Sequence, residues 1–180
     1  PAVELMALIT PANSTAQVVA GSTYYGTDYT KPPASTVYGK PQVVPFFLGP
    51  EGIANAISDA DDNDGPNRTA VLASGWGAGQ TGEALGQLPE GDLDDIDIVI
   101  LDNNTNRAGG GFWTMYHPFA SLLLTTDEPT PDDLDVPILD VGYGYNINGN
   151  APTDPLNLFS LGNSLAAYAY GYGGEQTAVI

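Results

Sequence analysis

Residues 69–88 read TAVLASGWGAGQTGEALGQL, and the fold class can be inferred from this stretch. The run from Thr69 to Ala73 is short and apolar, which is typical of a buried strand. A glycine-rich turn follows at once, Gly75-Trp76-Gly77-Ala78-Gly79, and the next residues, Gln80 to Leu88, predict a helix. The stretch therefore predicts a buried strand that turns directly into a helix.

Similar short apolar runs predict further strands at residues 3–9, 43–48 and 97–101. Helices are expected at residues 51–59 and at residues 156–169. A surface loop is expected at residues 21–41 and a long irregular segment at residues 105–155, because both are rich in turn-forming residues. Continuous apolar strands that alternate with helices indicate a mainly parallel sheet covered on both faces. We therefore predict a single α/β domain over residues 1–180.

Composition excludes several classes of function. The chain has 22 Asp plus Glu against 4 Lys plus Arg, a net charge of −18, so it repels phosphate backbones and we expect no nucleic-acid partner. It has no cysteine, which excludes disulfides, thiolate metal sites and a cysteine nucleophile. No apolar run approaches the ~20 residues that a membrane helix needs, so we do not expect an integral membrane protein.

The glycine-rich turn has the form of a known catalytic motif. In serine hydrolases of α/β fold, a strand ends in G-x-S-x-G and a helix begins immediately, which presents the serine at a strained turn. Placed on residues 75–79, this frame puts Gly77 at the nucleophile position, and glycine has no side chain to attack a carbonyl. Ser74 is expected at the strand end, where using it as nucleophile would put Leu72 and Trp76 at positions that need small residues. A phosphate loop is excluded because no lysine follows.

Two later segments extend the pattern, Asn104-Thr105-Asn106-Arg107-Ala108-Gly109-Gly110-Gly111 and Tyr145-Asn146-Ile147-Asn148-Gly149-Asn150-Ala151-Pro152-Thr153-Asp154-Pro155-Leu156-Asn157. With the glycine-rich turn, their order and spacing resemble the PE-PPE domain family of mycobacteria, whose members carry segments like G-Y-S-Q-G, N-P-x-R-x-x-G-G and Y-D-G-W-A-D-F-P-x-x-P-L-N. The resemblance covers about Ala7 to Tyr172. It implies an α/β-hydrolase-like fold with serine esterase or acyltransferase activity.

The departures from that family concern its catalytic positions. Gly77 replaces the nucleophile, Asn146 and Asn150 replace the two acidic residues, and no histidine follows residue 117. An amide cannot stabilise a catalytic imidazolium as a carboxylate does. The resemblance therefore implies a member of the family that has lost its catalytic residues, and we expect no cofactor. We expect a non-catalytic pseudo-hydrolase that serves as a structural, binding or adhesion module.

The same resemblance implies a setting and partners. We expect an extracellular, cell-envelope or virion-surface location, in an actinobacterial envelope assembly or on a virus that infects such hosts. The expected partners are proteins of a larger assembly, with an envelope glycan or lipid as further candidates.

Two alternatives remain open. The chain could be an active serine esterase or acyltransferase on cell-envelope lipid esters, with Ser74 or Ser121 as nucleophile and His117 as base. It could also be an acidic Ca²⁺-dependent binding module, because Asp59, Asp61 and Asn63 have the one-three-five spacing of an EF-hand loop. The EF-hand pattern fails at its sixth position, which is Asp64, and at its twelfth, which is Ala70.

Aromatic residues gather in the regions predicted as loops and at the glycine-rich turn. Aromatic side chains favour interfaces, so we regard them as candidate binding residues, although they could equally pack over the sheet edges. They are Tyr24, Tyr25, Tyr29, Trp76, Phe112, Trp113 and Tyr116.

Overall fold

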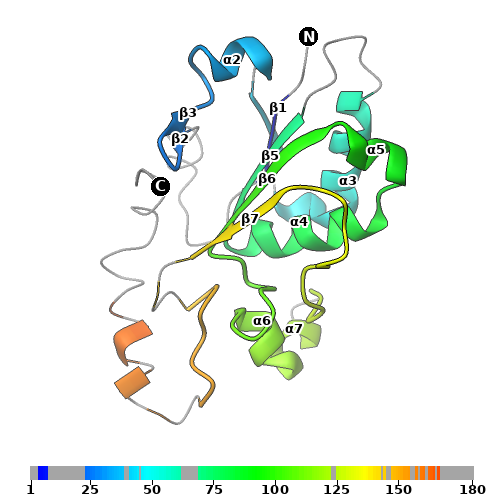
Figure 1. Cartoon of the computed structure of the whole chain (residues 1–180). Coiled ribbons are helices and arrows are strands. Elements are labelled where there is room, and N and C mark those ends of the chain that lie inside the picture. Colours follow the sequence, from blue (N-terminus) through cyan, green and yellow to red (C-terminus); the bar gives the residue numbers. More distant parts are fainter. Residues whose placement is uncertain are drawn as a thin grey trace.

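The computed structural model describes residues 4–7, 23–38, 41–44, 46–61, 69–122, 125–142, 144, 147–154, 157, 159–160, 162–164 and 166. Five strands form one sheet in the order β4-β1-β5-β6-β7, and every neighbouring pair is parallel (Figure 1). The chain leaves β1 for β4 on one side and then crosses to β5 on the other. The strand order therefore reverses between β1 and β5, which is where open α/β sheets bind ligands. The strands are β1 (Glu4–Ala7), β4 (Pro41–Val44), β5 (Thr69–Ser74), β6 (Ile96–Asp102) and β7 (Ile138–Val141).

Helices connect and cover these strands, as the sequence predicts. Two of them are longer than two turns, α3 (Gly49–Asp61) and α4 (Trp76–Gln87). A small antiparallel hairpin forms a second sheet from β2 (Thr23–Tyr24) and β3 (Thr27–Asp28). The remaining short elements are α2 (Ala34–Val37), the 3-10 turn η1 (Phe46–Leu48), α5 (Glu90–Asp94), α6 (Phe112–Met115) and α7 (His117–Leu122).

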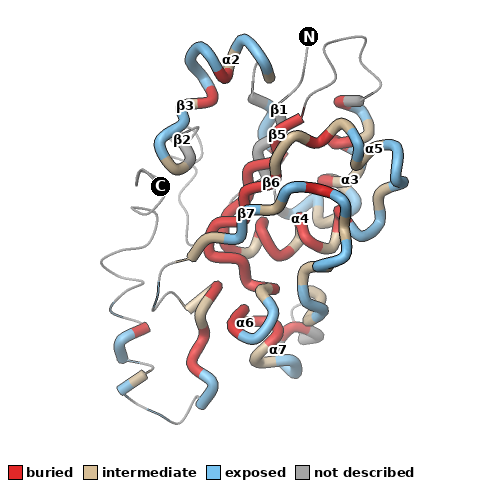
Figure 2. Tube along the Cα trace, in the orientation of Figure 1, coloured by how far each residue is buried: buried red, intermediate tan, exposed pale blue. Residues whose placement is uncertain are grey.

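The core lies on both faces of β5 and β6, because every residue of β5 is buried (Figure 2). Val71 and Ala73 pack with Ile53 and Ile57 of α3 and with Leu85 of α4. The alternate residues face the other way, where the aromatic segment that follows the hairpin covers them; this second cluster contains Ala70, Leu72, Ile100, Tyr29 and Ala34. Burial on both faces explains why β5 is a continuous apolar run rather than an alternating one.

Several predicted boundaries are wrong. The expected surface loop at residues 21–41 contains the β2–β3 hairpin and α2, and the expected irregular segment at residues 105–155 contains α6, α7 and β7. These elements are only two to six residues long, too short for periodicity to reveal. Of the described residues of the predicted last helix, 159–160, 162–164 and 166 are helical and 157 is not. Within the described residues, no helix is both long and apolar enough to span a membrane.

Candidate functional site at the carboxyl edge of the sheet

The chain turns directly from β5 into α4 at Gly75. Gly75 adopts φ 57° and ψ −122°, a conformation that side chains strongly disfavour, and α4 begins at the next residue. The backbone N–H of Gly75 donates to the carbonyl of Asp102 at 2.7 Å, and the carbonyl of Gly75 accepts from the N–H of Gly79 at 3.3 Å. This backbone has the strained strand-to-helix form in which α/β hydrolases hold their nucleophile.

The nucleophile position of this turn is Gly75 and not Gly77. The strand continues through Ser74 and the helix begins at Trp76, so Gly77 lies buried in the first turn of α4. The sequence frame selects Gly77 because glycines lie two residues to either side of it, whereas Gly75 has Ala73 two residues before it.

Ser74 belongs to a buried polar cluster beside this turn. It is paired in register with Asp102 on β6, and its hydroxyl donates to Asp102 Oδ2 at 3.0 Å. The hydroxyl of Tyr25 donates to Oδ1 of the same carboxylate at 2.5 Å, and the amide of Asn103 donates to Oδ1 at 3.2 Å. Ser74 is 3% exposed and Asp102 is fully buried. The sequence analysis did not identify Asp102 as a site residue. The available signal was an acidic residue at the end of an apolar strand.

A run of buried polar residues continues from β6 and contacts the turn at Gly75. Residues 103–106 are all at most 2% exposed. Asn104 Nδ2 donates to Thr130 Oγ1 at 2.9 Å and to Asp140 Oδ2 at 3.0 Å. Asn106 Nδ2 donates to two backbone carbonyls, those of Thr126 at 3.0 Å and Glu128 at 2.9 Å. The first half of the motif at residues 104–111 is therefore a structural anchor for the 125–130 segment.

The predicted base is engaged elsewhere. His117 begins α7, and its Nδ1 lies 2.8 Å from Asp127 Oδ2. The side chains of this pair are 63% and 42% exposed. Within the described ranges, no hydrogen bond joins His117 to Ser74. Ser121 lies in α7, but its side chain is outside the described residues.

Four of the candidate aromatic residues form one cluster next to the turn. The ring centroids of Trp76 and Trp113 are 5.5 Å apart, those of Trp113 and Phe112 4.8 Å, and those of Phe112 and Tyr116 4.9 Å. Trp113 is 6% exposed, whereas Trp76, Phe112 and Tyr116 are half-buried. The Tyr116 hydroxyl donates to the carbonyl of Pro152 at 2.7 Å.

Tyr25 and Tyr29 of the hairpin region make their recorded contacts elsewhere. The side chain of Tyr24 lies outside the described residues. Tyr25 reaches Asp102, and Tyr29 packs in the core against the ring of Tyr38, with 5.8 Å between centroids.

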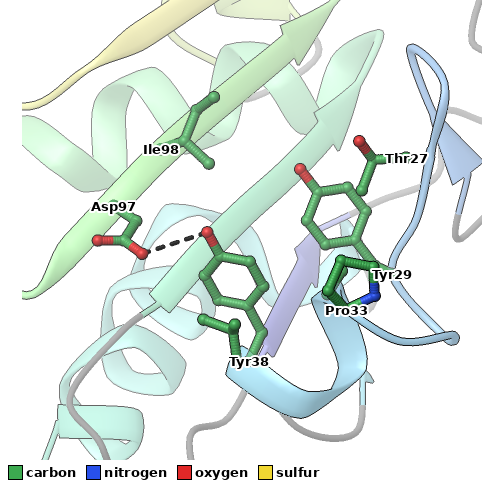
Figure 3. A pocket seen from close by; sticks show the side chains of 8 residues that line it. Thr27, Tyr29, Pro33, Tyr38, Asp97 and Ile98 are labelled. Carbon is green, nitrogen blue, oxygen red and sulfur yellow. Dashed lines mark hydrogen bonds between the residues drawn. The ribbon is translucent and has the colours of Figure 1, made fainter.

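The hairpin region instead lines a surface groove at the opposite end of β6 (Figure 3). There the hydroxyl of Tyr38 donates to Asp97 Oδ2 at 3.2 Å. Tyr38 and Tyr25 thus hold the 23–38 segment to both ends of β6. The groove residues are Thr27, Tyr29, Pro33, Ala34, Val37, Tyr38, Asp97 and Ile98.

The remaining candidates are Asp59, Asp61, Asn63, Asn146 and Asn150, of which the structure describes three. Asp59 and Asp61 lie in the last turn of α3, which is helical rather than a cation-binding loop, and Asn63 lies outside the described residues. No cluster of His, Asp or Glu in the described part of the chain could hold a metal ion. Asn146 is outside the described residues, and Asn150 packs beside the backbone of Gly110.

Comparison with known proteins supports the fold. One similar solved structure is described as "A novel cutinase-like protein from Cryptococcus sp."; it aligns over 99% of this chain and 95% of its own, with a TM-score of 0.51 and 12% sequence identity. No family model and no curated protein matches the chain. The structural likeness confirms the predicted α/β-hydrolase-like fold. Because the sequence identity is only 12%, it shows the fold alone. The resemblance to the PE-PPE family stays a prediction.

Proposed function

We propose that this chain is a non-catalytic α/β-hydrolase-like module that acts by binding. The observation that carries the proposal is Gly75, which occupies the strained position of the strand-to-helix turn with φ 57° and ψ −122°. The fold retains the backbone that would present a nucleophile and offers no atom to attack a carbonyl there. Nucleophilic catalysis needs both that atom and an adjacent base.

The neighbouring serine is a poor replacement. The Ser74 hydroxyl is buried within β5 and already donates its proton to Asp102. A serine nucleophile needs a base that can take this proton while the oxygen meets the substrate. His117 instead pairs with Asp127 at an exposed position. These contacts favour a structural role for the buried cluster over the alternative of an unconventional esterase.

The setting of the module is part of the proposal. The PE-PPE resemblance favours an actinobacterial envelope assembly, or a virion of a virus that infects such hosts, with other proteins of the assembly as partners. The net charge of −18 fits a surface that stays dispersed at high local concentration and avoids nucleic acid.

Hydrolysis of short- and medium-chain p-nitrophenyl esters tests the proposal, together with labelling by a fluorophosphonate probe for active serines. We expect the wild type to give no turnover above the uncatalysed rate and no label. Ser74→Ala should behave identically, because Ser74 has no catalytic task. Gly75→Ser places a hydroxyl at the strained turn, and any labelling of this variant would show that the turn still activates a serine.

The contradicting outcome is turnover by the wild type that Ser74→Ala abolishes. That result would establish the unconventional esterase. Gly77→Ser is the matched control, since its hydroxyl would lie within α4 and should acquire no label.

A further inference from the structure

The segment between α7 and β7 lines two surface cavities that meet at one leucine. The first has a volume of about 400 Å³ and the second of about 340 Å³, and Leu134 lines both. The segment passes beside α4 before it enters the sheet (Figure 1), because the glycines of α4 let Thr130 and Pro131 approach that helix. Since the cavities share a residue, we treat them as one groove and call it the 130–140 groove.

The first cavity has an apolar lining. Val136 is 8% exposed, and Leu134 and Ile138 are half-buried and pack against the core. All three side chains line this cavity. Its basic residue is already paired, because Arg107 Nε donates to Asp140 Oδ1 at 2.8 Å. The first cavity therefore suits an apolar side chain of a ligand.

The second cavity carries carboxylates from two elements. Helix α5 contributes Glu90 and Asp94, and the 130–140 segment contributes Asp133 and Asp135. All four residues are exposed. In the part of the chain that the structure describes, none of the four carboxylates has a hydrogen-bond or ion-pair partner. Like charges around one cavity repel one another, so a cation among them is favoured.

The lining of the second cavity favours a side-chain cation over a metal ion. Among the described residues, no group of acidic side chains is arranged so that it could hold a metal ion. Leu93 and Leu134 line the cavity together with the carboxylates. Lysine and arginine side chains place their aliphatic stems on apolar surface and keep their charged ends at its edge. The mixture of leucines and carboxylates matches such side chains.

The described basic residues of the chain are engaged away from this cavity. The chain contains four Lys plus Arg. Lys31 pairs with Asp28, and Arg107 pairs with Asp140 at the first cavity. The other two basic residues, at positions 40 and 68, lie outside the described residues. A positively charged partner would supply the complement to the four carboxylates.

We propose that the 130–140 groove binds a basic peptide segment of a partner protein. An apolar side chain of the segment occupies the first cavity, and its lysine or arginine side chains occupy the second. Opposite charges on two partners speed their association and discriminate against wrong partners. The inference names the chemistry of a protein partner and therefore rests on the proposed binding function.

The test uses the full chain and peptides labelled with tetramethylrhodamine, followed by fluorescence anisotropy. The peptide KKLKVKKG has apolar and basic side chains, KKSKSKKG keeps the charge without the apolar side chains, and EELEVEEG reverses the charge. At about 0.15 M salt, distant surface charges are screened. We expect KKLKVKKG to bind there with a Kd on the order of 100 μM or tighter. KKSKSKKG should bind roughly tenfold more weakly because it buries less apolar surface, and EELEVEEG should not bind.

A pair of double variants separates the groove from the net charge of the chain. Asp133→Asn with Asp135→Asn removes two charges from the second cavity and should weaken binding of KKLKVKKG by roughly three- to tenfold, the effect of two exposed ion pairs. Glu51→Gln with Asp154→Asn is the matched control, because both residues are exposed and neither lines the groove. The control has the same net charge and should bind as the wild type does. Thermal unfolding checks that both variants are folded.

The inference is overturned if KKLKVKKG does not bind, or if KKSKSKKG binds as tightly. It is also overturned if the control loses as much affinity as the groove variant, because binding would then follow net charge alone. These failures are distinguishable from failure of the proposed function. Turnover of p-nitrophenyl esters by the wild type would contradict the proposed function and leave peptide binding intact, whereas absent peptide binding without turnover would overturn this inference alone.

Discussion

Two neighbouring strands end at the same edge of the sheet, and the chain continues from them in opposite ways. After β5, the chain turns at Gly75 into α4, whose inner face consists of glycine, alanine, threonine and leucine. After β6, it continues as a buried run of polar residues, Asn103 to Asn106. The first region is held by apolar packing and the second by side-chain hydrogen bonds to backbone carbonyls and to Thr130 and Asp140.

The difference shows which contacts keep the turn in shape. The two regions meet directly, because the glycines of α4 let the polar run and the segment after it approach the helix. Positions 79, 82 and 86 lie against Thr105 and Asn106, against Thr130, and against Pro131. A buried polar run costs stability unless every group is paired, so this close approach has to be maintained.

Replacement of Gly79 should have the largest effect, because it separates the two regions. A Cβ at this position would overlap Asn106 Oδ1 and Thr105 Oγ1. Asn106 cannot yield easily, since its amide is held by the carbonyls of Thr126 and Glu128. We expect Gly79→Ala to lower the free energy of unfolding by about 3 kcal/mol, the upper range for overpacking. Urea denaturation followed by circular dichroism measures this.

Gly91→Ala is the matched control. Gly91 lies in α5, and a Cβ there would meet no atom within 4 Å. The change should stabilise the chain by about 0.5 kcal/mol, because alanine loses less backbone entropy in a helix than glycine does. Equal behaviour of the two variants would mean that α4 and the polar run are not in close contact.

The same contrast explains what the sequence could and could not predict. The β5–α4 region was predictable, because an apolar run followed by a glycine-rich turn has few other interpretations. The exact turn residue was missed, because only Gly77 has glycines two residues before and after it, whereas the turn residue Gly75 has Ala73 two residues before it. The polar run after β6 has the composition of a surface loop, and only tertiary contacts reveal that it is buried. The glycine spacing of α4 at positions 79, 82 and 86 was the available signal for a closely packed neighbour.

Removal of the Tyr25 hydroxyl should have an intermediate effect, because it weakens the junction at which the polar run begins. The hydroxyl donates to the buried Asp102 carboxylate at 2.5 Å. Hydrogen bonds to charged groups contribute about 2 kcal/mol, so Tyr25→Phe should destabilise by about that amount in urea denaturation. Tyr38→Phe removes a longer bond of 3.2 Å to Asp97 at the other end of β6 and should cost about 0.5 kcal/mol. Equal losses of unfolding free energy in the two variants would contradict the expectation that the Tyr25–Asp102 hydrogen bond contributes more than the Tyr38–Asp97 bond.

Neutralisation of Glu83 should have the smallest effect, and it concerns the contact between α4 and the 125–130 segment. Burial, and then the charge of Glu128 on the 125–130 segment, raise the pKa of Glu83 above its ordinary value of 4.5. A carboxyl whose pKa is raised by folding favours the folded state while protonated, so the wild type loses this stability as the pH rises from 4.5 through the folded pKa. Glu83→Gln should therefore stabilise the chain by about 0.5 kcal/mol at neutral pH.

The stabilisation by Glu83→Gln should depend on pH in one direction. Below pH 4.5 the wild-type carboxyl is itself neutral, so the advantage of Glu83→Gln should vanish there. Thermal unfolding at pH 4 and pH 7 measures the difference, with Glu90→Gln in the exposed first turn of α5 as a control that should gain nothing. A gain that persists unchanged at pH 4 would show that helix propensity, and not repulsion between α4 and the 125–130 segment, is responsible. In that case the polar region would stabilise α4 through hydrogen bonds alone, with no charge opposing their contact.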